Sequence, residues 1–277
     1  MSAPPRMPVV AGQFYPSSRE DLLKVIENSF LHPLGPGEKP PFDGDAPYGI
    51  ITPHAGFLYS GPIAAHSYHA ISSARGFDRI IIIGPNHRGL GDDVSIPSSA
   101  WWMTPLGNVE IDIEAAAELS ALSFINQNDL SHREEHSIEV QLPFLQYLYG
   151  NDVKLLPISM LRQDKETAVE LGEAIVRIKG KNIIVASSDL THYEPHHAAS
   201  LKDNRLIKYI ENLEVDQYYR VLRDEMISAC GYGPIAAIMT ACKIMGAKGG
   251  KLLKYATSGE TGEKKDSVVG YASISFT

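Results

Sequence analysis

Four side chains that can bind metals or move protons each come shortly after a run of apolar, mostly β-branched residues. They are His54, His87, Asp189 and His192. Short apolar runs bounded by turn-forming residues are typical of strands that are buried on both faces. In open α/β sheets, ligands bind beyond the carboxyl ends of the strands. The pattern therefore predicts that these four side chains meet at one edge of a sheet.

A cysteine completes this set of candidate residues. Cys230 stands in the stretch ACGYGPI, where glycines permit a close approach and Pro234 suits the first turn of a helix. A thiol near a helix N-terminus has its thiolate favoured by the helix dipole, which predicts a lowered pKa for Cys230. Cys242 lies about two turns further along the same predicted helix and is interpreted as a small packing residue.

Two imidazoles and one thiolate can form a three-ligand face for a metal ion, so His54, His87 and Cys230 are the predicted ligands. Imidazole together with thiolate suits iron, copper or zinc better than magnesium or calcium. Asp189 and His192 would then orient a ligand or transfer a proton, and they are the predicted acid–base pair.

A second metal motif occurs in the stretch SHREEH, residues 131–136, which contains the H-x-x-E-H spacing of an inverted zinc-peptidase motif. Ser131 as N-cap and Glu134 three residues later predict a capping box at the start of a helix. His132 and His136 would share one face of that helix. Metal-dependent hydrolysis is therefore one alternative function.

Four further residues are predicted to line the pocket of the main site. They are Glu135, His136, Arg88 and Tyr193. A second alternative function is a non-catalytic binding protein that recognises a peptide or a small anionic ligand in the same pocket. In that case Arg88 and the pair Trp101-Trp102, which could cap the pocket, would matter more than Cys230.

Strand-like and helix-like segments alternate along the chain, which predicts a single α/β domain whose mostly parallel sheet is flanked by helices. Strands are predicted at residues 48–52, 79–83, 152–159, 182–187, 251–257 and 267–276. Helices are predicted at residues 18–30, 63–72, 113–122, 166–178, 198–213, 215–226 and 234–245. Residues 1–47, which include a Pro- and Gly-rich stretch, are interpreted as an N-terminal arm that packs on this domain.

Composition excludes several classes of partner. The 277 residues are 44% hydrophobic and 21% charged, an ordinary balance for a globular protein. The net charge of -8 and the absence of a basic stripe argue against nucleic acid. No run approaches the roughly 18 apolar residues that span a bilayer, so no membrane partner is expected. Because 2 cysteines are too few for a disulfide scaffold, a cytoplasmic location is expected.

Seven blocks in order resemble the Memo family, the B component of the AmmeMemoRadiSam group, over nearly the whole chain. The blocks are RMPVVAGQFYP, ITPHAGFLYSGPIAAH, IIIIGPNHRG, EEHSIEVQLPFLQ, VASSDLTHY, ACGYGPIAA and VVGYASISF. The resemblance implies a fold similar to the class III extradiol ring-cleaving dioxygenases, which hold non-haem iron with two histidines and a glutamate. By that likeness His54 and His87 correspond to the metal histidines, and Cys230 falls at the glutamate position. Asp189 and His192 fall near the catalytic base.

The resemblance implies a metal protein with redox chemistry. Cys230 departs from the dioxygenase pattern, since a thiolate is a softer and more oxidisable ligand that favours copper or a different electronic state of iron. Family members from higher organisms are associated with copper or iron binding, redox chemistry and phosphotyrosine-peptide recognition. The resemblance also implies a functional link to a radical SAM protein and an AMMECR-type protein.

Overall fold

Eleven strands form one sheet in the part of the chain that this computed structural model describes, residues 4–41, 44–262 and 264–277. The strands are β1 (Gly49–Thr52), β2 (Arg79–Pro85), β3 (Val94–Ile96), β4 (Trp101–Thr104), β5 (Gly107–Ile111), β6 (Asn126–Gln127), β7 (Lys154–Met160), β8 (Asn182–Ser187), β9 (His192–Glu194), β10 (Gly250–Thr257) and β11 (Val268–Phe276). The central strands run parallel in the order β1-β8-β2-β7. Antiparallel neighbours flank them, with β11 beside β1 and β3 beside β7. The predicted α/β fold with a mostly parallel sheet is therefore confirmed.

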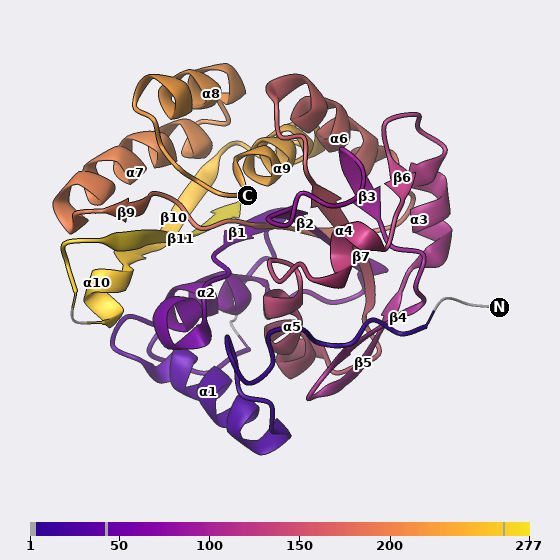
Figure 1. Cartoon of the computed structure of the whole chain (residues 1–277), viewed down its shortest axis with the longest axis horizontal. Helices are drawn as coiled ribbons and strands as arrows, with labels where there is room; N and C mark the ends of the chain where they lie inside the picture. The colour runs from indigo at the N-terminus through magenta and orange to yellow at the C-terminus, as the bar shows by residue number, and fades with distance from the viewer. Residues whose placement is uncertain (1–3, 42–43, 263) are drawn as a thin grey trace.

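Helices cover both faces of this sheet (Figure 1). They are α1 (Arg19–Leu31), α2 (Phe57–Ile71), α3 (Ile113–Ser120), α4 (Leu130–Arg133), the 3-10 helix η1 (Glu139–Gln141), α5 (Leu142–Tyr149), α6 (Lys165–Arg177), α7 (His196–Glu211), α8 (Val215–Asp224), α9 (Tyr232–Met245) and α10 (Ser258–Thr261). In Figure 1, α6 to α9 lie on one side of the sheet, and α1, α2 and α5 lie on the other. The helices predicted between residues 18 and 122 and between residues 166 and 245 are present, although α2 begins well before residue 63. Among the described residues, none of the helices has both the length and the apolar character that crossing a bilayer requires.

The four isoleucines of β2 show why both faces of the sheet are covered. Ile81 and Ile83 belong to the hydrophobic core beneath α6 and α9, whereas Ile80 and Ile82 belong to the core beneath α1 and α2. All four are 0% exposed. Because successive side chains of a strand point to opposite faces, an unbroken apolar run needs a hydrophobic layer on each side.

The carboxyl ends of three adjacent parallel strands lie side by side. Strand β8 pairs with β1 on one side and with β2 on the other, all three in the same direction. The segments that leave these ends carry His54 after β1, Asp189 after β8 and His87 after β2. The order of the strands therefore brings together residues that lie far apart in the sequence.

The N-terminal segment crosses the β4–β5 hairpin before α1 begins. The backbone N–H of Arg6 donates to Trp101 O at 2.9 Å, and Met103 N–H donates to Arg6 O at 2.8 Å. Helix α1 starts after Ser18, whose side chain accepts a hydrogen bond from Asp21 N–H and satisfies a free donor of the first turn. Arg6 thus ties the N-terminal segment to the hairpin.

Candidate metal centre

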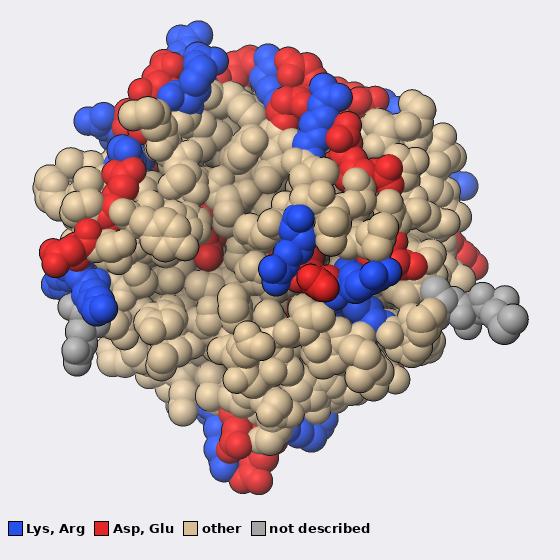
Figure 2. Space-filling view, in the orientation of Figure 1, with Lys and Arg blue, Asp and Glu red and all other residues tan. Residues whose placement is uncertain are grey.

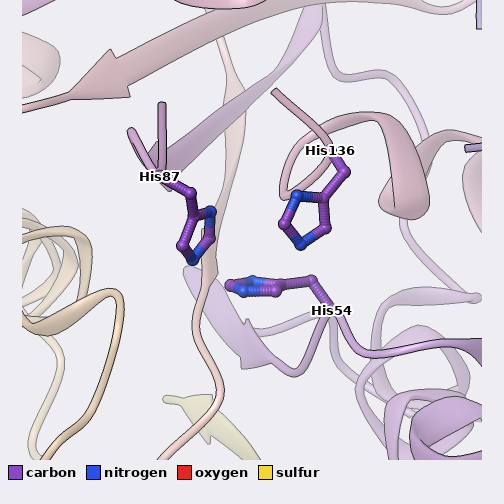
Figure 3. Close-up of side chains that lie close together, drawn as sticks. All are labelled: His54, His87 and His136. Carbon is purple, nitrogen blue, oxygen red and sulfur yellow. The ribbon is translucent and has the colours of Figure 1, made fainter. Parts of the chain in front are cut away.

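Three histidines converge at the carboxyl edge of the parallel strands. One ring nitrogen from each of His54, His87 and His136 lies within 4.8 Å of the others. The ring centroid of His54 is 5.2 Å from that of His87 and 5.4 Å from that of His136. Figure 3 shows the rings of His87 and His136 directed toward the ring of His54. Imidazole is a suitable ligand for iron, copper and zinc, so this histidine cluster can hold a metal ion.

The hydrogen bonds around His54 determine which of its ring nitrogens is available. Nδ1 lies 2.9 Å from Ser187 Oγ. The hydroxyl of Ser187 donates to Ser137 O at 2.7 Å and accepts from Gln141 Nε2 at 2.8 Å. Since a hydroxyl has one proton to donate, His54 Nδ1 must be the donor to Ser187. The lone pair of His54 Nε2 is therefore available to a metal.

Glu135 orients the other two histidines. Its Oε1 lies 2.9 Å from His87 Nδ1 and 3.4 Å from His136 Nδ1, and its Oε2 accepts from the backbone N–H of His87 at 2.6 Å. Burial alone would raise the pKa of Glu135, but hydrogen bonds from His87 and Ser137 and the charges of the two histidines lower it to about 2. An ionised carboxylate behind an imidazole fixes the ring and leaves its other nitrogen for a metal.

The imidazoles of His54 and His136 are neutral at pH 7. Burial lowers the pKa of His54 well below 6.5, and the neighbouring histidines lower it further. Burial also lowers the pKa of His136 to about 4. His54 is 2% exposed, whereas the side chain of His87 is 31% exposed, so the cluster leads from the interior to the surface. Neutral imidazole is the form that binds a metal, and these rings need to lose no proton to do so.

Cys230 lies beside the histidine cluster. Its Sγ is 3.2 Å from His54 Nε2 and accepts from Asp189 N–H at 3.3 Å. The structure thus brings the predicted residues His54, His87 and Cys230 together and adds His136. The predicted lowering of the thiol pKa is wrong, because burial and the Asp189 carboxylate raise the pKa of Cys230 above its usual value. Cys230 precedes Gly231, the N-cap of α9, and so lies outside the first turn, where the helix dipole acts.

This raised pKa predicts a slowly reacting thiol. In metal-free protein at pH 8, we expect Cys230 to react with iodoacetamide at least about tenfold more slowly than free cysteine, because only the thiolate is nucleophilic. A Cys242→Ser variant isolates the signal, and mass spectrometry over time measures it. If Cys230 reacts as fast as free cysteine, the pKa of its thiol is not raised.

Asp189 and His192 occupy the side of the cluster next to β8. Asp189 Oδ1 accepts from His54 N–H at 2.8 Å. Burial raises the pKa of Asp189 to about 6, although the N–H of His54 and the charge of His192 act in the opposite direction. A carboxyl group with such a pKa can exchange protons near neutral pH. His192 Nδ1 donates to Ser228 O at 2.9 Å, which leaves Nε2 as the acceptor nitrogen.

The remaining predicted pocket residues, Arg88 and Tyr193, are exposed. Arg88 is exposed, its Nε donates to Glu134 O at 2.9 Å, and its charge helps to lower the pKa of His136. Tyr193 is 78% exposed and has a φ of 60°, a left-handed conformation that is unusual for a bulky residue. Trp102 is buried and does not cap the cluster. The Arg6 guanidinium lies over the Trp102 ring, with Cζ of Arg6 4.3 Å from the centroid of that ring.

The predicted helix over residues 131–136 is wrong. Helix α4 ends at Arg133, and its N-cap is Asp129, which makes no side-chain cap bond. The Glu135 carboxylate instead accepts the backbone N–H groups of the two following residues, which holds them in a turn. His132 is therefore buried against Trp102, with ring centroids 5.5 Å apart, while His136 joins the cluster. The sequence indicated His136 as a pocket residue of the main site and as a partner of His132 in the alternative H-x-x-E-H motif, but not as a neighbour of His54 and His87 in one cluster.

These features define an α/β protein with a candidate metal centre at the carboxyl edge of its parallel strands. Its fold is similar to a solved structure described as uncharacterized protein JW3007 from Escherichia coli K12, with a TM-score of 0.52. That match covers 82% of this chain and 98% of the other chain at 12% sequence identity, a level that shows a shared fold alone.

The sequence assigns the family. The model of the Memo-like protein family matches residues 6–275, and the chain belongs to this family. The MEMO1 family protein MK0963 of Methanopyrus kandleri is 46% identical over 279 residues, which cover 98% of each chain. A MEMO1 family protein of Nitrosopumilus maritimus is also 46% identical, over 274 residues that cover 98% of this chain and 99% of the relative.

Proposed function

We propose that this protein binds one iron or copper ion, with zinc as the third candidate, and has a redox role. The observation that supports this most strongly is the convergence of three imidazole nitrogens within 4.8 Å, with the Cys230 thiol 3.2 Å from His54 Nε2. His54 and His87 would bind the ion, and His136 and Cys230 are the further donors. A bound iron or copper ion supplies electron transfer and Lewis acidity.

The surrounding residues suit this role. Glu135 holds His87 in the tautomer that turns Nε2 toward the cluster. Asp189 and His192 would transfer protons beside the ion, since the pKa of Asp189 is raised to about 6. The raised pKa of Cys230 keeps a proton on Sγ in the metal-free chain, and ligation is the means by which this thiol would lose it.

Metal content of single variants tests the ligand set. Protein purified without oxygen and loaded with Fe(II) or Cu(I) is expected to bind one ion per chain, and His54→Ala and His87→Ala are expected to lose it, because both rings face the cluster. Comparison of the metal bound by His136→Ala with that bound by Cys230→Ser shows which of these two residues is a ligand in addition to His54 and His87. His197→Ala, at an exposed position of α7, is the matched control. Elemental analysis by mass spectrometry measures bound metal.

Three outcomes would count against the proposed function. If His54→Ala binds as much metal as the unmodified protein, the histidine cluster is not the metal site. If His132→Ala loses the metal and His54→Ala keeps it, the hydrolase alternative is favoured. Metal-stripped protein that still binds a peptide or an anion after Cys230→Ser would favour the binding-protein alternative.

The redox role has its own test. The loaded protein is titrated with dithionite and ferricyanide while the spectrum of the bound metal is followed. We expect a reversible change of oxidation state that is absent from His54→Ala. A bound ion that does not change oxidation state in this titration would overturn the redox role and leave the metal site standing.

A further inference from the structure

A segment near the N-terminus contacts the loop that carries the site residues Glu135 and His136. We define the N-terminal strap as residues 6–15. The Arg6 guanidinium donates through Nε to His132 O at 2.7 Å, through Nη2 to Glu135 O at 2.5 Å and through Nη1 to Glu139 Oε2 at 2.8 Å. One buried side chain of the strap therefore contacts the loop that contains Glu135 and the helices α4 and η1 that precede and follow it.

Glu139 accepts the hydrogen bonds that hold the strap in place. Its carboxylate is 0% exposed and accepts the N–H groups of Val9 and Val10 at 2.9 and 3.1 Å. It also accepts the Tyr15 hydroxyl at 2.6 Å and the guanidinium of Arg6. All of these donors belong to the strap. A buried carboxylate with this set of partners holds the strap against the loop.

The strap also contacts the histidine cluster itself. The ring of Phe14 meets the ring of His136 edge-on, with centroids 4.8 Å apart. The carbonyl of Phe14 accepts from Phe57 N–H at 2.8 Å, at the start of α2 and three residues beyond His54. The strap thus lies between two segments that supply histidines to the site.

The loop that carries Glu135 and His136 depends on such outside contacts. Residues 134–138 belong to neither a helix nor a strand. Within the loop, the Glu135 carboxylate accepts the N–H groups of His136 and Ser137, but these bonds do not place the loop relative to the sheet. From the sheet side, Ser137 Oγ donates to Pro85 O at 3.0 Å, Ser187 Oγ donates to Ser137 O at 2.7 Å and His87 N–H donates to Glu135 at 2.6 Å. Arg6 adds the contact to Glu135 O from the side of the strap.

We infer that docking of the N-terminal strap and metal binding at the histidine cluster are coupled, with Arg6 and Glu139 as positioning residues that act through Glu135 and His136. This inference rests on the proposed metal site. Substitution of residues that hydrogen-bond to metal ligands commonly weakens metal binding by about 10- to 100-fold. Since coupling between two equilibria is reciprocal, metal binding also stabilises the docked position of the strap.

The substitution Arg6→Lys tests the coupling with Co²⁺ as the probe. Lysine keeps the charge beside Glu139 but lacks the planar fork that holds the two carbonyl groups. We expect the dissociation constant for Co²⁺ to rise about tenfold or more, with a shift of the visible Co²⁺ spectrum that a loss of stability alone would not cause. Arg79→Lys is the matched control, because Arg79 forms a partly buried pair with Asp112 at 2.7 Å at the opposite end of β2. It is expected to bind Co²⁺ like the unmodified protein.

Hydrogen exchange provides a second measurement that needs no change to the strap. In the unmodified protein, Co²⁺ is expected to slow exchange of the amides of Val9 and Val10 by roughly tenfold. Linkage requires that metal binding favours docking of the strap by the same factor by which docking raises the metal affinity. In His54→Ala, Co²⁺ is expected to leave these rates unchanged. This comparison decides the matter if Arg6→Lys fails to fold.

The outcomes separate two kinds of failure. If the unmodified protein binds no Co²⁺, both the proposed metal site and the coupling are overturned. If it binds Co²⁺, but Arg6→Lys and Arg79→Lys bind equally well and exchange in the strap is insensitive to Co²⁺, the coupling alone is overturned.

Discussion

Replacing Glu139 by alanine is expected to lower the free energy of unfolding by about 3–5 kcal/mol, the usual cost of removing one partner of a buried ion pair. The Arg6 guanidinium, with its side chain 7% exposed, would lose its only carboxylate partner among the described residues. The N–H groups of Val9 and Val10 and the hydroxyl of Tyr15 would lose their acceptor as well. Urea unfolding of the metal-free protein measures the change.

Two comparisons sharpen this prediction. Glu173→Ala removes a carboxylate that lies 3.9 Å from Arg177 on an exposed helix face, and it is expected to cost less than about 1 kcal/mol. The double variant Arg6→Met, Glu139→Leu is expected to cost less than the sum of its single changes, because neither charge is then left buried alone. A loss below about 1 kcal/mol for Glu139→Ala would show that the pair does not hold the N-terminal strap.

Replacing Glu135 by glutamine is expected to remove much of the dependence of stability on acid pH. The pKa of Glu135 falls from 4.5 to about 2 in the folded chain, so its ionised form stabilises the fold. That contribution is complete above about pH 4.5 and is lost as the pH falls toward 2. A shift of this size corresponds to about 3 kcal/mol. The stability gap between the unmodified protein and Glu135→Gln should therefore narrow across this window.

Urea titrations of metal-free protein at several pH values between 2 and 7 measure this gap. Glu110→Gln is the control, since Glu110 lies in an exposed pair with Lys154 at 3.7 Å and contributes little at any pH. Burial also lowers the pKa of His54, and the stability from this neutral ring is lost at acid pH in both proteins, so it largely cancels in the comparison. The contribution of His136 differs between the two proteins, because the Glu135 charge raises the pKa of His136 against the effect of burial. A gap that stays constant from pH 6 to pH 2 would contradict the assigned role of Glu135.

The parts of the site that local patterns mark were predictable from the sequence. The isoleucines of β2 form an unbroken apolar run, which predicted a strand buried on both faces with His87 beyond its end. The same reasoning placed His54 after β1 and Asp189 after β8. Strand and helix signals are local, so they survive without knowledge of the fold.

Local signals failed where the surroundings decide the outcome. The spacing in residues 131–136 predicted a helix, but the Glu135 carboxylate binds the N–H groups of its neighbours and the helix ends at Arg133. A glycine-flanked thiol ahead of a helix predicted a lowered pKa for Cys230, but desolvation raises it. Both errors arise because burial and side-chain partners, which a local pattern does not show, decided the outcome.

By itself, the sequence determined the alternation of strands and helices and the residue types at the strand ends. Only the tertiary structure decided that β8 lies between β1 and β2, and that His136 completes the histidine cluster. It also decided that Arg6 pairs with Glu139, 133 positions away. Such pairings depend on which surfaces meet when the chain folds. They cannot be predicted from a short stretch of sequence, because the partners lie far apart in the chain.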